Sequence, residues 1–386
     1  MKIAFIGHKT VPSNEGGIER VVERQAIGLK GLGHEPVLYN RGGGVFKIAG
    51  GRHKGNKSYK GMRIVTVPAP GGALGVPLYS FLSTVHAAAA GSDVLFFHAS
   101  GPCNMIRLAR LLGKPSVGML HGLDSRRAKW GRFASWYLKK GEKAAATKAD
   151  RCLVLSRSMK QMLEEEYGKS SGFGSERIEV TRNNVDIPQA KGNDLIKERW
   201  GLDPEGYVMT SARIVPEKEI HTLIRAFREC GTDKKLVIAG GASGRGKAYL
   251  AELRRLAGDD DRIIFAGHVD TEALTELYSN AYVFVLASSL EGMSVALLEA
   301  MASGCCCLTS DIPENTDVTG DIGVSFRTGD AEDLKEKLEM LLSDGDRVRE
   351  LGEKARMRAE SSADDSCIEL LDEIFKEVAG GKDSQG

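Results

Sequence analysis

Residues 283–303 read VFVLASSLEGMSVALLEAMAS, a stretch that predicts the unit from which the rest of the chain is built. It begins with an apolar, β-favouring run, 282–286, which is typical of a buried strand. A short polar loop follows, and apolar residues then recur at helical spacing from Val295 until Gly304 ends the helix. Strand, loop and helix in this order form the repeating unit of an α/β domain.

Two carboxylates bracket the turn in this stretch: Glu291 stands just before the predicted helix and Glu299 stands inside it. Eight helical steps of about 1.5 Å each would put them about 12 Å apart. The paired acid and base of a glycosidase stand about 5 to 9.5 Å apart, so this spacing does not suit acid–base work. It suits two contacts with one elongated ligand that lies across a helix N-terminus.

Length and composition describe an ordinary soluble protein. The chain has 386 residues, enough for two domains, and no window approaches the 18 uninterrupted apolar residues of a membrane-spanning helix. The start, MKIAFIGHK, has too short an apolar core for a signal peptide and predicts a first strand instead. Seven cysteines without a CxxC pair indicate neither a zinc site nor a disulfide framework, so a reducing cytoplasm is expected.

The net charge of +1 conceals a strong difference between the two halves of the chain. Residues 1–185 hold 29 Lys and Arg against 13 Asp and Glu, whereas residues 186–386 hold 24 against 39. The difference indicates two separate units, of which the basic one would be drawn to phosphates or to an anionic membrane face. The basic half includes a glycine-rich stretch, 41–61, that predicts a long loop.

Predicted strands and helices alternate along the whole chain, and the alternation restarts after residue 186. A first strand at 2–7 leads through a glycine-containing loop into a helix at 18–32, the opening of a doubly wound α/β domain. The polar stretch 188–193 is typical of a linker. Two similar α/β halves facing each other across a cleft are therefore expected, with a further helix at 368–378. Other strands are predicted at 37–39, 62–67, 94–97, 116–120, 152–155, 177–180, 207–212, 235–239, 262–265, 282–286, 305–308 and 324–326.

Two candidate groups follow predicted strands in the first half, at the sheet edge where open α/β sheets bind ligands. Gly16 and Gly17 precede the first helix; they form either a plain turn or an opening through which a phosphate reaches backbone N–H groups. His121 follows the strand 116–120 and is either a structural histidine or a ligand-contacting one.

Two further candidates follow strands in the second half. Arg213 and Lys218 stand five residues apart; they either clamp a diphosphate or are solvated surface charges. The loop from Gly241 to Lys247 has the glycine and lysine spacing of a Walker loop, but Ala248 replaces the residue that would bind Mg²⁺. A loop at the rim of a cleft fits this stretch better than a nucleoside triphosphatase loop.

Residues 126–148, RRAKWGRFASWYLKKGEKAAATK, hold eight Lys and Arg against one acid, with aromatic side chains between them. On a helix, Trp130, Phe133 and Tyr137 would form an aromatic face beside a basic one, as in helices that bind a membrane surface. The alternative is a core helix whose exposed side is basic. Nucleic acid is a poor partner, because no nucleic-acid-binding module accompanies the patch. The residues assigned to membrane or acceptor contact are Arg126, Arg127, Lys129, Trp130, Arg132, Phe133, Trp136 and Tyr137.

Taken together, these residues resemble the retaining glycosyltransferases of family 4, which have the GT-B fold of two Rossmann-like, doubly wound parallel sheets. Residues 291–299, EGMSVALLE, are similar to the family's E-x7-E motif. The pair of Arg213 and Lys218, the two glycines and His121 resemble further parts of its donor site, in the same order. NEGGIERVVE and HGLD in the first half look like the subgroup of bacterial cell-wall and capsule rhamnosyltransferases.

The resemblance implies a role for each matching part of the chain. Residues 1–186 would form the acceptor-binding domain and residues 187–360 the nucleotide-sugar-binding domain. Residues 361–386 would form a C-terminal helix that packs back across the domains, followed by a flexible tail.

The resemblance also implies contacts with the donor. Arg213, Lys218 and the amides of Gly16 and Gly17 would hold the diphosphate. Glu299 would bind the ribose, while Glu291 would bind the transferred sugar. The residues with an implied catalytic role are His121, near the reacting carbon, and Glu291, Arg213 and Lys218. Further donor contacts are implied for His268 and Val269 at the nucleobase and for Met293, Ser294 and Val295 at the helix start.

The implied protein is an enzyme at the inner face of the cell membrane, cytoplasmic and peripheral. It would transfer rhamnose or another hexose from a nucleotide diphosphate sugar to a lipid-linked glycan in surface polysaccharide synthesis, with retention of configuration. Its partners would be that donor, that acceptor and the anionic membrane surface. No metal or other cofactor is expected, because cations and helix termini would neutralise the leaving group. The alternative is a GT-B relative that binds or epimerises a nucleotide sugar without transfer.

Three departures from the family pattern leave the donor sugar, nucleotide, acceptor and linkage open. Glu219 stands where a glycine is common after the lysine. Met293 and Ser294 replace a frequent aromatic–proline pair. Residues 181–186, TRNNVD, replace an IPNGVD-like turn.

Overall fold

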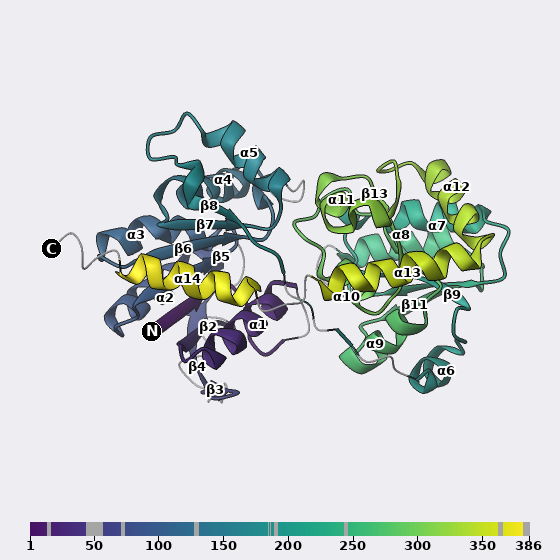
Figure 1. Ribbon diagram of the computed structural model, residues 1–386, viewed down its shortest axis with the longest axis horizontal. Coiled ribbons are helices and arrows are strands. Elements are labelled where there is room, and N and C mark those ends of the chain that lie inside the picture. Colours follow the sequence, from purple (N-terminus) through teal and green to yellow (C-terminus); the bar gives the residue numbers. More distant parts are fainter. Residues whose placement is uncertain are drawn as a thin grey trace. The chain divides into compact units, whose positions relative to one another are not determined.

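The chain divides into two compact units, each an α/β sheet flanked by helices (Figure 1). Unit 1 comprises Met1–Asn184 with Asp365–Gly386, and unit 2 comprises Val185–Asp364. The computed structural model describes residues 1–13, 17–43, 57–70, 74–126, 131–183, 185, 187–188, 192–242, 246–361 and 366–380. None of the helices within these ranges is both long enough and apolar enough to cross a bilayer.

The sheet of unit 1, in the described residues, has the strand order β3-β4-β2-β1-β5-β6-β7-β8. Its neighbouring strands are parallel except for β3 and β4, which are antiparallel. From β1 the chain moves outward to β2 and β4, and β5 then returns to the other side of β1, so the winding reverses between β1 and β5. The strands are β1 (Lys2–Ile6), β2 (Glu35–Gly43), β3 (Ser58–Tyr59), β4 (Met62–Ala69), β5 (Val94–His98), β6 (Ser116–Leu120), β7 (Arg151–Val154) and β8 (Ile178–Val180).

The helices of unit 1 cover this sheet, which explains why a strand such as β5, apolar as far as His98, is buried at every position. Gln25 of the first helix reaches β6, where its Nε2 lies 3.4 Å from Sδ of Met119. The α-helices are α1 (Gly17–Gly31), α2 (Gly75–Ala89), α3 (Ile106–Leu111), α4 (Arg132–Lys148), α5 (Arg157–Tyr167) and α14 (Ser366–Gly380). Short 3₁₀ turns are η2 (Pro102–Met105), η3 (Asp124–Arg126) and η4 (Ser175–Arg177).

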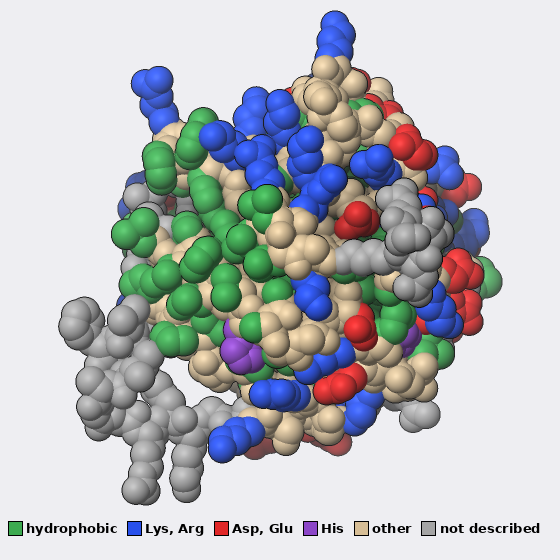
Figure 2. Space-filling view, turned by 90° about the vertical axis from the view of Figure 1, so that its left-hand side faces the viewer, with side chains coloured by type: hydrophobic (Ala, Val, Ile, Leu, Met, Phe, Trp, Pro, Cys, Tyr) green, Lys and Arg blue, Asp and Glu red, His purple; other side chains and the backbone are tan. Residues whose placement is uncertain are grey.

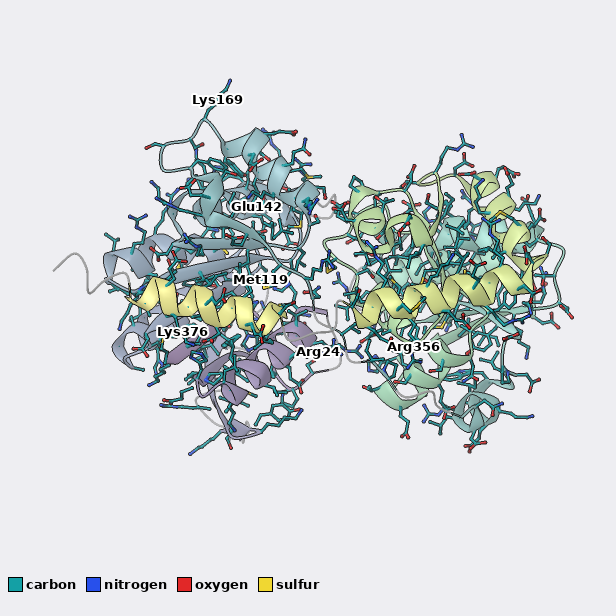
Figure 3. All side chains as sticks on the ribbon, viewed as in Figure 1. Arg24, Met119, Glu142, Lys169, Arg356 and Lys376 are labelled. Carbon is teal, nitrogen blue, oxygen red and sulfur yellow. The ribbon has the colours of Figure 1, made fainter. Side chains whose placement is uncertain are left out.

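The C-terminal helix α14 is part of unit 1, although all of unit 2 precedes it in the sequence. Phe375 is fully buried, and its ring makes an edge contact with Phe96 of β5, with centroids 5.2 Å apart. Nε2 of His34 lies 2.8 Å from a carboxylate oxygen of Asp372. The same carboxylate pairs at 2.8 Å with Lys376 on the exposed side of the helix (Figure 3). Apolar and polar contacts therefore both hold α14 on unit 1.

The sheet of unit 2 has the order β11-β10-β9-β12-β13-β14 in the described residues, and every neighbouring pair is parallel. Here the winding reverses between β9 and β12. Successive residues of β9 enter different apolar clusters: Val208 packs on one face, and Tyr207 and Met209 on the other. The strands are β9 (Tyr207–Ser211), β10 (Lys235–Ala239), β11 (Ile263–Gly267), β12 (Val283–Leu286), β13 (Cys306–Ser310) and β14 (Val324–Phe326).

Helices connect the strands of unit 2, and several begin at a side chain that caps the free N–H groups of the first turn. Asp270, Ser294, Asp330 and Asp344 each accept such a bond. The α-helices are α6 (Asp194–Trp200), α7 (Ile220–Glu229), α8 (Gly246–Ala257), α9 (Thr271–Asn280), α10 (Val295–Ala302), α11 (Pro313–Thr319), α12 (Ala331–Leu342) and α13 (Gly345–Glu360). The 3₁₀ turns are η5 (Pro216–Lys218) and η6 (Gly320–Ile322).

The predicted fold class, two doubly wound α/β sheets, is confirmed. One boundary was wrong: the loop predicted from residue 41 begins later, because β2 continues to Gly43 alongside β4. The remainder of that predicted loop, 44–56, lies outside the described residues.

Candidate functional site

The loops that follow β9 and β12 meet at the C-terminal edge of the unit 2 sheet, where the winding reverses. Ligands of open α/β sheets bind at such a reversal, because the loops on either side diverge and leave an opening. A backbone hydrogen bond ties the two loops together, from N–H of Ser289 to the carbonyl oxygen of Glu217, at 3.0 Å. Groups from distant parts of the sequence are thereby held at one place.

Lys218 and Glu291 form an ion pair at this junction, in which Nζ of Lys218 donates to Oε1 of Glu291. The lysine side chain is 14% exposed and the glutamate side chain 9% exposed, so both charges are largely removed from water. Arg213, on the same loop as Lys218, is exposed. The structure thus brings together two of the residues that the sequence predicted and adds a contact between them that the sequence did not indicate.

Glu219, the residue that replaces the expected glycine, adopts the left-handed backbone conformation with φ of 51°. This conformation costs about 1 to 2 kcal/mol for a residue with a Cβ, which is why glycine suits the position. Two side-chain contacts compensate here: Oγ1 of Thr222 donates to the Glu219 carboxylate at 3.0 Å, and Nε2 of His221 lies 3.2 Å from it. Nδ1 of His221 also contacts the hydroxyl of Tyr249 at 2.8 Å.

The N-terminus of α10 at Val295 lies four residues after Glu291 in the sequence. Oγ of Ser294 accepts a hydrogen bond from N–H of Leu297 at 3.3 Å and so begins the helix. Met293 and Val295 are partly exposed on either side of this cap, and Glu299 is partly exposed in the helix. Free backbone N–H groups and the helix dipole make such a terminus favourable for an anion.

His268 and Val269 follow β11 on the same sheet edge, further from the reversal. Backbone bonds link the intervening loops, from Gly240 N–H to Gly267 at 2.7 Å and from Ile214 N–H to Gly241 at 3.1 Å. His268 is exposed and Val269 partly exposed. The loops after β11, β10, β9 and β12 therefore form one continuous rim that carries every described candidate of unit 2. Residues 243–245 of the Walker-like loop lie outside the described residues.

Three histidines gather at the corresponding reversal in unit 1. His8 follows β1, His98 ends β5, and His121 follows β6, the next strand in the sheet. Nδ1 of His98 lies 3.0 Å from Nε2 of His121, and the two rings stack with centroids 5.3 Å apart. The backbone approaches closely at this point: a Cβ on Gly7, whose φ is 131°, would lie only 2.1 Å from the carbonyl oxygen of His98.

Burial keeps these histidines neutral at physiological pH. It lowers the pKa of His8 to about 4, although a 2.9 Å contact of Nε2 with Oδ1 of Asn40 partly opposes the shift. Burial also lowers the pKa of His121 to about 4, and it lowers the pKa of His98 well below the usual value. Because both rings of the His98–His121 pair are neutral, one ring donates the shared hydrogen and the other accepts it. The tautomer of His121 is therefore coupled to that of His98.

His98 was not predicted from the sequence as a site residue. It ends the apolar strand VLFFH, and it is fully buried. The signal was available, since a titratable residue at the C-terminal end of a parallel strand is the same feature that singled out His121. Its adjacency to His121 depends on the pairing of β5 with β6, which the sequence alone did not specify.

The remaining unit 1 candidates are spread over other elements. Gly17 begins α1, while Gly16 lies outside the described residues, as do Arg127, Lys129 and Trp130. Phe133 and Trp136 are exposed on α4 and stack with centroids 5.6 Å apart. The described part of the predicted aromatic face differs from the expected one. Tyr137 is partly buried, with its hydroxyl shielded from solvent, and Trp136 rather than Tyr137 accompanies Phe133.

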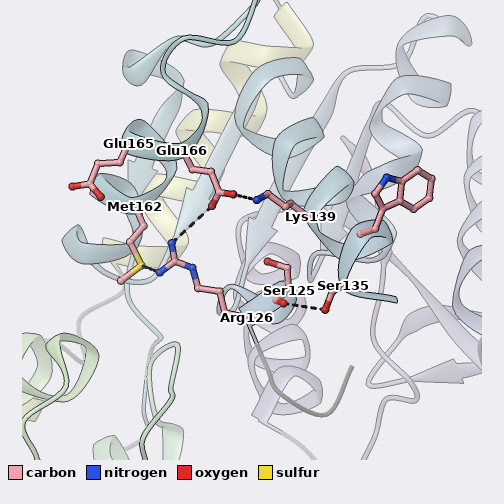
Figure 4. Close-up of a pocket in the computed structure, with 8 residues that line it drawn as sticks. Ser125, Arg126, Ser135, Lys139, Met162, Glu165 and Glu166 are labelled. Carbon is pink, nitrogen blue, oxygen red and sulfur yellow. Dashed lines mark hydrogen bonds and ion pairs between the residues drawn. The ribbon is translucent and has the colours of Figure 1, made fainter. Parts of the chain in front are cut away.

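A surface hollow of about 620 Å³ lies beside α4 (Figure 4). Arg126 crosses it to approach Glu166 at 3.8 Å, and Lys139 pairs with the same carboxylate. Glu165 also lines the hollow. The two carboxylates balance the two cations, so the hollow offers no net positive charge to a diphosphate and we assign it no part in donor binding. Among the described residues, no group of three or more His, Cys, Asp or Glu is arranged to hold a metal ion.

Comparison with known proteins adds family matches for both units. Residues 193–358 match the family described as Glycosyl transferases group 1, and residues 15–188 match Glycosyltransferase Family 4. D-inositol 3-phosphate glycosyltransferase of Nocardia farcinica is 30% identical over 228 residues, covering 56% of this chain and 50% of that protein. O-antigen chain mannosyltransferase RfbU of Salmonella typhimurium is 29% identical over 154 residues, covering 39% and 40%. The aligned regions thus span half or less of these curated relatives.

Solved structures match the fold over nearly the whole chain. Sucrose-phosphate synthase of Thermosynechococcus elongatus superposes with a TM-score of 0.82 at 17% identity, covering 98% of this chain and 99% of that one. Anabaena HepE, in complex with UDP and glucose, gives 0.78 at 17% identity over the full length of both. Two Rossmann-like units with this likeness define the GT-B fold. The chain belongs to the group 1 and family 4 glycosyltransferases.

Proposed function

We propose that this protein transfers a hexose from a nucleotide diphosphate sugar to a lipid-linked glycan, with retention of configuration. The observation that carries the proposal is the junction at the reversal of the unit 2 sheet. There the nearly buried Lys218 and Glu291 meet beside the N-terminus of α10. A cation and a helix terminus suit a diphosphate, and a neighbouring carboxylate suits sugar hydroxyls.

Each candidate of unit 2 receives a role in holding the donor. Lys218 and Arg213 neutralise the diphosphate, together with the N–H groups of residues 293–295. Glu291 accepts hydrogen bonds from the transferred sugar, Glu299 accepts them from the ribose, and His268 with Val269 contacts the nucleobase. Donor binding then requires Lys218 to exchange its present partner, Glu291, for phosphate oxygens. The Anabaena relative in complex with UDP-glucose supports a nucleotide sugar as the donor class.

Catalysis consists mainly of positioning and of stabilising the leaving group. As the glycosidic bond breaks, charge develops on the diphosphate, where the two cations and the α10 terminus stabilise it. The departing diphosphate takes the proton of the acceptor hydroxyl, which attacks from the same face. His121, neutral and held by His98, contacts the sugar near the reacting carbon, and Gly16 and Gly17 contact the phosphates through their backbone N–H groups. Cations and dipoles carry the charge, so the proposed reaction uses no metal.

The acceptor side rests on the basic, aromatic helix α4 and on the relatives. Cations of α4 suit anionic headgroups, and Trp136 and Phe133 suit the boundary of the bilayer. The name of the Salmonella relative, an O-antigen chain mannosyltransferase, supports a role in surface polysaccharide synthesis. We therefore propose a cytoplasmic protein, peripheral at the inner face of the cell membrane. Rhamnose is the first sugar to test, given the similarity of the first half of the chain to rhamnosyltransferases.

The proposal is tested by measuring nucleotide release from a panel of nucleotide sugars, with a lipid diphosphate glycan as acceptor. Release that depends on the acceptor is expected for one donor, and Lys218→Ala and Glu299→Ala should each abolish it while the circular dichroism spectrum stays unchanged. Lys247→Ala is the matched control, because this exposed lysine of α8 would matter only if the Walker-like loop bound phosphate. Near-normal turnover in both site variants would refute the assignment. Release without an acceptor would favour a protein that acts on the nucleotide sugar alone.

A further inference from the structure

Helix α2 of unit 1 exposes large apolar side chains along one face. Leu78, Phe81, Leu82 and Val85 follow one another at helical spacing, and Leu74 precedes them at the N-cap. These five side chains are between 36% and 71% exposed. The chain around them is uncharged: no Asp, Glu, Lys or Arg occurs from Ile64 to Ser92. An apolar stripe of this kind normally faces a protein core.

The opposite face of α2 carries hydroxyl groups and is the face that packs on unit 1. Ser80, Ser83 and Thr84 are fully buried there. Ser80 donates to the carbonyl oxygen of Val76 at 2.8 Å, and Thr84 donates to that of Ser80 at 2.7 Å. Because the Ser80 and Thr84 hydroxyls bond within the helix itself, these two small polar residues can face the interior at little cost. The polarity of α2 is thus inverted relative to an ordinary surface helix.

Two neighbouring helices extend the apolar face and supply charge beside it. Leu111 and Leu112, at the end of α3, are exposed, as are Phe133 and Trp136 on α4. Figure 2 shows hydrophobic side chains gathered on one face of unit 1, with Lys and Arg side chains along one border. The exposed cations on α3 and α4 are Arg107, Arg110, Arg132, Lys139, Lys140 and Lys143.

The three helices form one surface because they pack around the same turn. Gly101, at the start of η2, lies under both α2 and α4: a Cβ placed on it would lie 3.2 Å from Val76, 3.8 Å from Tyr137 and 3.7 Å from Leu138. Helix α3 contacts both of its neighbours. The acid in these helices, Glu142 (Figure 3), is 1% exposed and accepts hydrogen bonds from Ser100 and Ser125. The exposed charge on α2, α3 and α4 is therefore entirely positive.

We propose that the apolar face of α2 inserts into the acyl boundary of an anionic bilayer, while the cations of α3 and α4 contact the headgroups. The inference deepens the proposed function and rests on it in one respect, because a lipid-linked acceptor has to be met at a membrane. It makes α2, rather than α4 alone, the inserting element. Apolar side chains that enter the boundary and cations that remain at the headgroups are the two contributions that hold a protein on a membrane surface.

A second copy of the chain fits this surface less well than a bilayer does. In a two-fold dimer the same patch meets itself, and because its exposed charge is entirely positive, neither protomer offers an acid to the cations of the other. Anionic lipid complements those cations instead. Lys140 is already placed for such a boundary, since its Nζ lies 3.9 Å from the ring centroid of Trp136, with the charge above an exposed aromatic face.

The test places a fluorescent probe on α2. The variant Phe81→Trp keeps an aromatic side chain at an exposed position, and Leu32→Trp places the same probe on an exposed site of unit 1 that lies just beyond α1. Full-length protein is mixed with vesicles of phosphatidylcholine and phosphatidylglycerol whose acyl chains are brominated. Insertion predicts that the added emission of Phe81→Trp is quenched and that of Leu32→Trp is not. Absence of quenching at residue 81 overturns the proposal.

A second arm measures binding by co-sedimentation with the same lipids. The triple variant Leu78→Gln, Phe81→Gln, Leu82→Gln should lower the vesicle partition coefficient about tenfold or more, because each substitution removes apolar area that the bilayer would bury. The control variant, Ile27→Gln with Leu32→Gln, should leave the coefficient unchanged. Wild-type binding by the triple variant overturns the proposal. The proposal is also overturned if the wild-type protein forms a dimer and does not bind vesicles, while the triple variant is a monomer. Sugar transfer by the wild-type protein to a short-chain acceptor in detergent is measured in parallel. If the wild type binds vesicles but transfers no sugar, the proposed function alone is refuted.

Discussion

The ion pair of Lys218 and Glu291 makes a prediction that can be worked through in numbers. We consider Lys218→Met and Glu291→Gln, each of which removes one charge and keeps most of the side-chain volume. Removing one partner of a buried pair costs about 3 to 5 kcal/mol, because the other charge is left without compensation. Here the side chains remain 14% and 9% exposed, so water still screens the pair and we expect a smaller cost of about 2 to 3 kcal/mol for each variant.

The double variant separates this explanation from simple loss of packing. With both charges gone, nothing unpaired remains, so the double variant should cost about as much as one single variant. The coupling energy in the cycle would then equal the cost of one single variant, about 2 to 3 kcal/mol. If the two costs add, the ion pair does not exist in solution and the account of the junction is wrong.

The measurement is urea denaturation followed by fluorescence. Trp200 is the tryptophan of unit 2, so a Trp130→Phe, Trp136→Phe background reports on that unit through Trp200. The matched control uses two exposed residues of α8, Lys247→Met and Glu252→Gln. Each should change the free energy of unfolding by less than about 0.5 kcal/mol.

Three further predictions concern unit 1. Gly28→Ala should destabilise unit 1 by about 1 kcal/mol in urea denaturation, because its Cβ would lie 2.8 Å from Cγ1 of Ile368 of α14. In an Ile368→Ala background, which lacks all the close carbons, Gly28→Ala should cost almost nothing further. The folded pKa of His8, about 4, lies below its unfolded value of about 6.5, so the unfolded state binds more protons between these values. Above about pH 6.5 this group should therefore not affect the free energy of unfolding, which should fall by about 3 kcal/mol as the pH drops to 4. His8→Gln should show a shallower fall over the same range. Equal slopes for the two proteins would contradict the lowered pKa of His8. His98→Phe keeps the stacking but removes the contact with His121; kcat should fall about tenfold with KM little changed, and an unchanged kcat would show that His98 does not position His121.

The sequence predicted the strands, and the candidate residues at their C-terminal ends, because both follow from local rules. Apolar runs bounded by polar loops indicated the strands, and Lys218 and Glu291 were singled out because both follow strands. Their contact could not be predicted the same way. It depends on β9 and β12 being neighbours, and strand order is set by how the whole sheet packs.

Helix α2 shows a different limit of sequence reasoning. Periodicity reveals that a helix has an apolar face, but it does not reveal which way that face points. The usual inference, that apolar means inward, fails at Phe81 because Ser80 and Thr84 satisfy their hydroxyls within the helix and can face the interior. The identity of the buried face is a tertiary property.

The place of α14 in unit 1 has a consequence for how the protein is made. Phe375 and Ile368 belong to the interior of unit 1, yet a ribosome synthesises them only after the whole of unit 2. Domains ordinarily fold in the order in which they emerge, with the N-terminal one first. Here unit 2 is complete and free to fold while Phe96 still lacks its partner ring. The first unit to be started is therefore the last to be finished, and its interior closes only with the final turns of the chain.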